Sequence, residues 1–222
     1  LTATGAHAQA QLSIAMDYLK ISELVDTMRI EGIEYAQTLN LDMLDGQGGS
    51  VWVKQVEGIF DAGIMTEAVR TSLSTLSDAQ LRKINQFYGS TLGQKVAGLE
   101  VAGGRAMLQD EVQDLARESY QNALANDPAS LAAIDTIEQV GDMVERNVTA
   151  SLTSNYRFYL GLVDGGAFEA TEDEMLADAW AQEDEIRLDT VNWLMGYMMV
   201  SYAPLNSLEM AQLVQFVQTP EG

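Results

Sequence analysis

A pattern typical of a capped helix occurs twice in this chain, and it limits the possible fold more than any other feature. Residues 76–93 read LSDAQLRKINQFYGSTLG, and residues 205–222 read LNSLEMAQLVQFVQTPEG. In each segment a Ser or Asn suits a helix N-cap, and a Gln or Glu three positions later completes a capping box. Apolar side chains then recur at helical spacing, as Leu81, Ile84 and Phe87 do in the first segment. The pattern predicts the same capped helix at both places, 129 positions apart.

The repeat continues upstream with a different spacing. Residues 23–46 match residues 142–165 at an offset of 119, and both segments end in Asp-Gly, which predicts a helix stopped by glycine. We therefore expect two related helical repeats of about four helices each, over residues 11–100 and 142–222. Residues 101–141 are expected to hold bridging helices, chiefly one long helix over 104–125, with Ser130 capping the helix that follows.

The fold class follows from the residues that are scarce. Proline occurs only at Pro128, Pro204 and Pro220, and no alternating β-branched runs flank an Asn-Gly or Asp-Gly turn. Apolar residues instead recur every three or four positions among good helix formers. The sequence predicts an all-α fold.

Composition excludes several classes of site. The chain has no Cys and only one His, His7, so disulfides, thiol nucleophiles and Cys-rich metal sites are excluded, and a His-based triad is not expected. It has 33 acidic and 12 basic side chains, a net charge of -21, which argues against nucleic-acid binding. No apolar run is long enough to span a membrane. The sequence therefore assigns no catalytic residue, cofactor or metal ligand.

The first ten residues predict export. Ala8-Gln9-Ala10 has the small-x-small form that precedes a signal-peptidase cleavage site. We interpret residues 1–10 as the end of a signal peptide, which predicts a bacterial periplasmic or secreted protein whose mature form begins at Gln11.

The segment 76–95 resembles the bacterial family catalogued as domain of unknown function 2059. The resemblance rests on Phe87, Tyr88, Ser90, Thr91, Gly93, Gln94 and Lys95, with Thr91 in place of the family's usual Pro. It implies a small helical domain, usually in exported proteins, with no established activity. From their place in the first turn of a helix, we expect Gln94 and Lys95 to have exposed heads rather than a catalytic role.

An acidic block covers residues 164–189, where ten carboxylates accompany one basic residue, Arg187. The spacing does not fit a calcium loop, so the block predicts a solvated acidic surface, with a weak divalent-cation site as the alternative. The eleven Met residues are interpreted as adaptable core filler.

Aromatic residues concentrate in the second half of the chain. Nine follow residue 143, including Trp180, Trp193 and Phe168, against seven before it. We expect core packing for most of them. We also expect a partner surface in the groove between the two repeats, which would draw on the aromatic residues of the second repeat, Trp180 and Trp193 among them. Its acidic walls would favour basic or amphipathic peptides or other envelope components. The expected function is non-enzymatic binding or scaffolding. The rival is a hydrolase that uses two carboxylates across a cleft.

Overall fold

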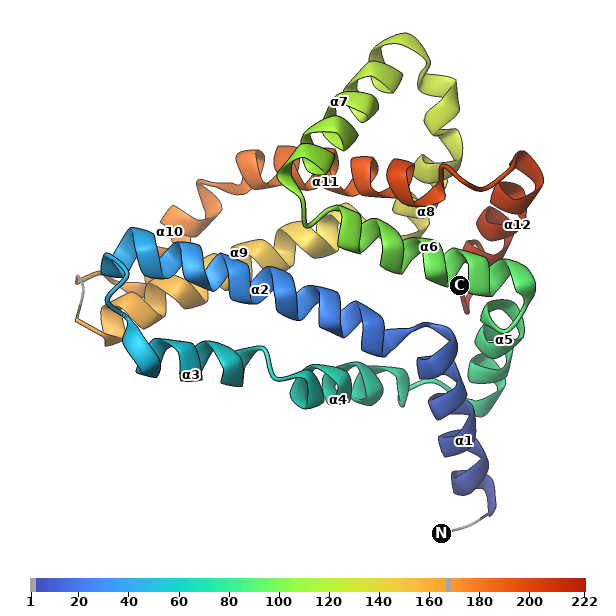
Figure 1. Ribbon diagram of the computed structural model, residues 1–222, viewed down its shortest axis with the longest axis horizontal. Coiled ribbons are helices and arrows are strands. Elements are labelled where there is room, and N and C mark those ends of the chain that lie inside the picture. The colour runs from blue at the N-terminus through green and yellow to red at the C-terminus, as the bar shows by residue number, and fades with distance from the viewer. Residues whose placement is uncertain (1–2, 167–168) are drawn as a thin grey trace. The chain divides into compact units, whose positions relative to one another are not determined.

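In the computed structural model, the described residues, 3–166 and 169–222, form helices joined by turns and no strand, and the predicted all-α class is confirmed (Figure 1). Packing divides the chain into two compact units. Unit 1 comprises Leu1–Gln109 and Thr219–Gly222, and unit 2 comprises Asp110–Gln218.

Unit 1 is built around the packing of its first helix on its fifth. Its helices are α1 (Ala3–Tyr18), α2 (Ile21–Leu44), α3 (Gly49–Ile59), α4 (Ala62–Leu73), α5 (Asp78–Tyr88) and α6 (Thr91–Ala106). α5 packs on α1, α4 packs on α2, and α6 packs on both α2 and α5. The core between them holds Leu12, Ala15, Val25, Leu81 and Ile84.

Unit 2 is built around α11 (Glu183–Tyr202), on which α7, α8 and α9 pack. Its elements are α7 (Asp110–Asn126), the 3-10 turn η1 (Pro128–Leu131), α8 (Ala132–Gly141), α9 (Met143–Asp164), α10 (Glu172–Trp180), α11 (Glu183–Tyr202) and α12 (Ser207–Val217). α7 packs on α11 (Figure 1). The two backbones approach so closely at Gly196 that a Cβ there would lie 3.0 Å from the carbonyl carbon of Ala116. The buried Asn192 of α11 accepts a hydrogen bond from Gln121 of α7.

Helices α1–α5 and α8–α12 pack in the same pairs. In each set of five the first helix packs on the second, fourth and fifth, and the second packs on the third and fourth. The common set of packed pairs covers five helices in each unit, where the sequence predicts repeats of about four helices. α6 in unit 1 and α7 in unit 2 are added to it.

The predicted caps are confirmed in both units. Ser77 Oγ accepts a hydrogen bond from the backbone N–H of Gln80 at 3.3 Å, and Gln80 Oε1 accepts one from the backbone N–H of Ser77 at 2.9 Å. Asn206 and Glu209 form the same box, with distances of 3.0 Å and 2.9 Å. Ile84 and Leu213 are buried at equivalent positions of the following helices, whereas Phe87 and Phe216 are only half-buried.

The bridge between the repeats differs from the prediction. The single helix expected over 104–125 breaks at residues 107–109, between α6 and α7. Gly103 and Gly104 weaken the end of α6, and Asp110 and Glu111 favour a new helix start because carboxylates are stabilised there. The predicted bridge 101–141 is thus divided between the two units, and its last helix, α8, belongs to the common set.

Two local predictions also need correction. Ser130 does not cap a helix, because its hydroxyl donates to the Asp127 carbonyl within η1 and α8 starts with no side-chain cap. The offset of 119 does not hold where α2 and α9 begin. Each follows a residue in the left-handed region, Lys20 (φ 53°) and Asp142 (φ 51°), and these lie 122 positions apart.

Candidate binding pockets

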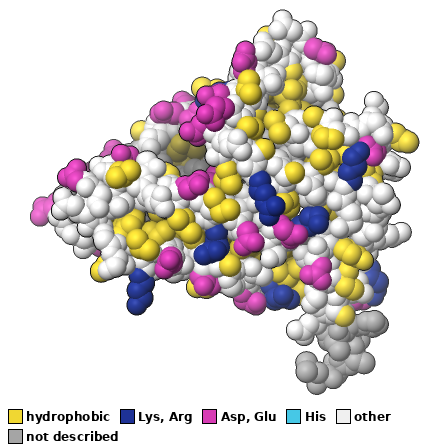
Figure 2. Space-filling model, in the orientation of Figure 1, with side chains coloured by type: hydrophobic (Ala, Val, Ile, Leu, Met, Phe, Trp, Pro, Cys, Tyr) yellow, Lys and Arg dark blue, Asp and Glu magenta, His cyan; other side chains and the backbone are white. Residues whose placement is uncertain are grey.

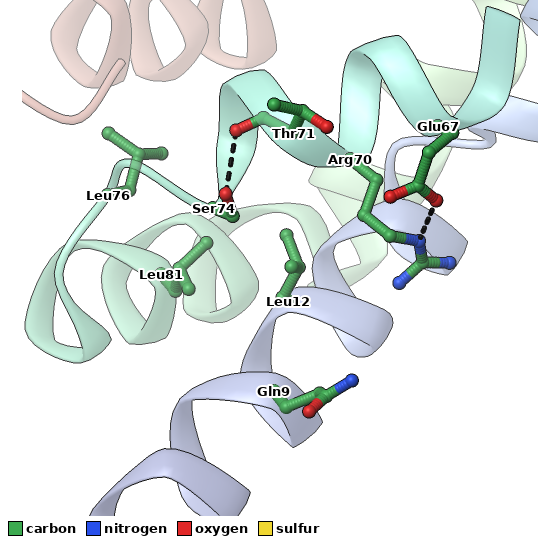
Figure 3. Close-up of a pocket in the computed structure, with 8 residues that line it drawn as sticks. All are labelled: Gln9, Leu12, Glu67, Arg70, Thr71, Ser74, Leu76 and Leu81. Carbon is green, nitrogen blue, oxygen red and sulfur yellow. Dashed lines mark hydrogen bonds and ion pairs between the residues drawn. The ribbon is translucent and has the colours of Figure 1, made fainter. Parts of the chain in front are cut away.

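Unit 1 contains a polar pocket with a leucine floor, shown in Figure 3. Leu12 of α1 and Leu81 of α5 both line the pocket, and Leu76 lies in the turn before α5. Gln9 and the end of α4 form the rim, where Arg70 Nε lies 3.4 Å from Glu67 Oε2 and Ser74 Oγ donates to the Thr71 carbonyl at 2.7 Å. The volume is about 300 Å³.

Unit 2 contains an apolar pocket that we call the methionine pocket. It lies between α8, the end of α11 and the start of α12, and its volume is also about 300 Å³. It is lined by Ser130, Leu131, Ala133, Ile134, Met198, Met199, Tyr202, Ala203, Leu205 and Met210.

The lining residues of the two pockets are related by the spacings of the sequence repeat. Four pairs of lining residues are 129 positions apart: Arg70 and Met199, Ser74 and Ala203, Leu76 and Leu205, Leu81 and Met210. On the first helix of each set, Gln9 corresponds to Leu131 and Leu12 to Ile134, with the spacing of 122 that also separates Lys20 from Asp142. The spacing found at the capped helices therefore extends upstream into α4 and α11.

A third pocket has an exposed indole at its edge. Trp180 is 59% exposed and lines a cavity of about 180 Å³ between α9 and α10, together with Thr149, Leu152, Thr153, Tyr156, Leu176 and Ala179. The Tyr156 hydroxyl donates to Glu172 Oε1 at 3.1 Å. Desolvation and this neighbouring carboxylate raise the pKa of Tyr156, so the phenol stays a donor. We call this cavity the Trp180 pocket.

The second tryptophan of the predicted partner surface lies elsewhere. Trp193 stacks on Tyr197 along α11, with ring centroids 5.5 Å apart and planes inclined by 9°. It lines none of the three pockets described above. Of these two tryptophans, only Trp180 lines one of the described pockets. Phe168 and the side chain of His7 lie outside the described residues.

A carboxylate pair suited to hydrolysis is not formed in these cavities. A shallow depression holds Asp142 and Glu145, but Arg187 donates to Glu145 and lowers its pKa, whereas a general acid needs a raised one. Burial and the nearby Glu34 raise the pKa of Glu31, which lines neither this depression nor the three pockets.

The acidic block serves mainly to start helices. Thr171 and Glu174 form a capping box for α10, and hydrogen bonds from Thr171 lower the pKa of Glu174. Arg187 Nη2 donates to Glu183 at 2.9 Å in the first turns of α11. Within residues 3–166 and 169–222, no group of three or more His, Asp or Glu side chains is arranged to hold a metal ion.

Gln94 of the family-like segment has a structural role that its sequence position did not predict. Its amide nitrogen donates to the carbonyls of Tyr18 at 3.0 Å and Tyr88 at 2.6 Å, so it joins the start of α6 to the ends of α1 and α5. The head group is therefore bound rather than free in solvent.

No protein-family model, curated protein or solved structure matches the chain. Among the described helices, none is both long and apolar enough to cross a membrane.

Proposed function

We propose that this chain is a non-enzymatic binding protein of the bacterial envelope, and that unit 2 binds a cationic amphipathic peptide segment at the Trp180 pocket. The observation that carries the proposal is the large indole left exposed over an apolar cavity. Exposed aromatic side chains beside a pocket are typical anchors of protein interfaces. The size of the cavity suits one aliphatic or aromatic side chain of the partner.

The charge of unit 2 selects the partner. Its residues 110–218 include 20 acidic side chains, four arginines and no lysine, a net charge of −16. Arg187 is paired with Glu145 and Glu183, and Arg117 lies 3.7 Å from Asp189. Beside the pocket, α10 begins with Glu172, Asp173 and Glu174. This field attracts Lys-rich and Arg-rich segments, and a cation over the Trp180 ring gains further stabilisation.

Export is the second part of the proposal. The Ala8-Gln9-Ala10 sequence and the resemblance of residues 76–95 support it. Sequencing the N-terminus of the protein from its native host tests it. We expect the mature chain to begin at Gln11, and a cytoplasmic protein that retains residues 1–10 would contradict it.

The binding test uses the fluorescence of Trp180 in a chain whose other tryptophans, Trp52 and Trp193, are replaced by Phe. We expect a Lys- and Leu-rich amphipathic helical peptide to shift the Trp180 emission saturably, and a Glu- and Leu-rich peptide of the same length to leave it unchanged. Binding is expected to weaken with added salt, because exposed charges are screened.

Substitution then separates the pocket from the general charge of the unit. In the wild-type background, Trp180→Ala is expected to weaken peptide binding about 30-fold, the effect of losing one interface hot spot. Trp193→Ala is the matched control and should change it little. Equal binding by wild type and Trp180→Ala would show that the peptide is held by surface charge alone and that the pocket is not its site.

A further inference from the structure

Three of the eleven Met residues line one cavity, the methionine pocket of unit 2. Met198 and Met199 come from α11, and Met210 comes from α12. We propose that this pocket binds a soft monovalent metal ion, Cu(I), through these three thioethers. The proposed site shares no residue with the Trp180 pocket and does not depend on peptide binding there.

Packing does not require methionine at position 210, as the related helix of unit 1 indicates. At the spacing of 129, Met198, Met199 and Met210 correspond to Val69, Arg70 and Leu81. Leu81 is only 1% exposed, so leucine fills the equivalent place in the same helix pairing. The thioethers gathered in unit 2 are thus a property of that pocket rather than of the fold.

The chemistry of the lining selects the ion. Thioethers are soft, neutral ligands that bind Cu(I), and no carboxylate lines the pocket to favour Mg²⁺ or Ca²⁺. Methionine has three rotatable bonds, so sulfurs from two helices can turn toward one ion. The net charge of −16 on unit 2 lowers the energy of a cation there, and Tyr202 provides an aromatic ring in the same lining.

The test measures transfer of Cu(I) from a coloured chelator to the whole chain under anaerobic, reducing conditions. All proteins carry His7→Ala, because imidazole also binds copper. We expect one equivalent to bind, with Ag⁺ competing for it. Met199→Leu with Met210→Leu is expected to lower the affinity at least about tenfold, since even outer-shell changes at metal sites have effects of that size.

The matched control is Met28→Leu with Met43→Leu, which replaces two α2 methionines that are 56% and 48% exposed. It should bind like the parent. Circular dichroism checks the fold of each variant. A pocket double variant that keeps the parent affinity, or a control that loses as much, would overturn the proposal.

A second measurement needs no substitution in the pocket. In a protein with ¹³C-labelled methionine methyl groups, Ag⁺ is expected to shift the signals of Met198, Met199 and Met210 first. Shifts confined to other methionines would overturn the assignment. So would an apolar dye that shifts the same three signals and is not displaced by Ag⁺, because the pocket would then be a site for hydrocarbon.

Discussion

The two units share a packing scheme and differ in what they place on it. Both pair five helices in the same way and start the fifth with a capping box. Unit 1 has 13 acidic and eight basic side chains, a net charge of −5, whereas unit 2 has a net charge of −16. On the face in Figure 2, most of the Lys and Arg side chains in view lie over helices of unit 1. The two units therefore share their helix pairs and capping boxes, and they differ in net charge and in the residues that line their pockets.

The fourth helix shows the same contrast. All twelve residues of α4 are described and none is buried, whereas the equivalent α11 has seven buried residues along its 20. The difference follows from α7, which packs on α11 and approaches it closely at Gly196. At the spacing of 129, the residue of unit 1 that corresponds to Gly196 is Glu67. α4 is only partly covered by its neighbours, whereas α11 is central to its unit because α7 also packs on it.

The largest expected effect tests whether corresponding core positions of the two units contribute equally to stability. Ile84→Ala and Leu213→Ala should each lower the free energy of unfolding by about 2–5 kcal/mol, because each leaves a cavity in a core. The residues are 6% and 1% exposed. Urea denaturation, monitored by amide hydrogen exchange in each unit, measures the loss of unfolding free energy.

The matched controls for this pair are Gln86→Ala and Gln215→Ala, two exposed residues at the same spacing of 129. Each should change the free energy of unfolding by less than about 0.5 kcal/mol. If only one of the two core variants loses much unfolding free energy, the comparison fails, because the same helix pairing would then not give the two units similar stability.

A smaller effect is expected from the feature that unit 2 alone has. Gly196→Leu should lower the free energy of unfolding by about 1–3 kcal/mol, since its side chain overpacks the α7 interface. Gly161→Leu in α9 is the control, because nothing lies within 4 Å of a Cβ there. The control should be neutral or slightly stabilising, as leucine favours helix more than glycine. Equal stability of both variants would mean that α7 does not press on α11.

The smallest expected effect compares the caps. Ser77→Ala and Asn206→Ala should each lower the free energy of unfolding by about 0.5–2 kcal/mol by removing a partner of the first-turn amides. Exchanging the two caps, Ser77→Asn and Asn206→Ser, should change it little, because these residues rank alike as N-caps. Thermal melts of all four variants measure this, and a costly exchange would show that the caps have diverged with their units.

Local chemistry made much of this fold predictable from sequence. A cap needs only residues three positions apart, so Ser77 with Gln80 and Asn206 with Glu209 were identified without tertiary information. The break between α6 and α7 was missed because the helical spacing continues across it. The break depends on two weak effects: Gly103 and Gly104 have low helix propensity, and the carboxylate of Asp110 favours the start of a new helix.

The pockets depend on tertiary packing, which local sequence patterns do not determine. Arg70, Leu12 and Leu81 come from three helices, and only the paired packing of those helices brings them together. A usable signal was present, however. Extending the offset of 129 upstream to Arg70 and Ser74 would have paired them with Met199 and Ala203. The sequence named Trp180 and Trp193 together, and telling the tryptophan that lines a pocket from the one that does not required their exposure and neighbours.

The absence of lysine from residues 110–218 decides how partners of unit 2 must be sought. Amine-reactive crosslinkers have no side chain to attack there, so they record only neighbours of unit 1. Trypsin has four arginines at which to cut unit 2 and releases long fragments that mass spectrometry detects poorly. Carbodiimide coupling, which joins carboxylates to a partner's lysines, together with a protease that cuts at Asp or Glu, reverses both disadvantages.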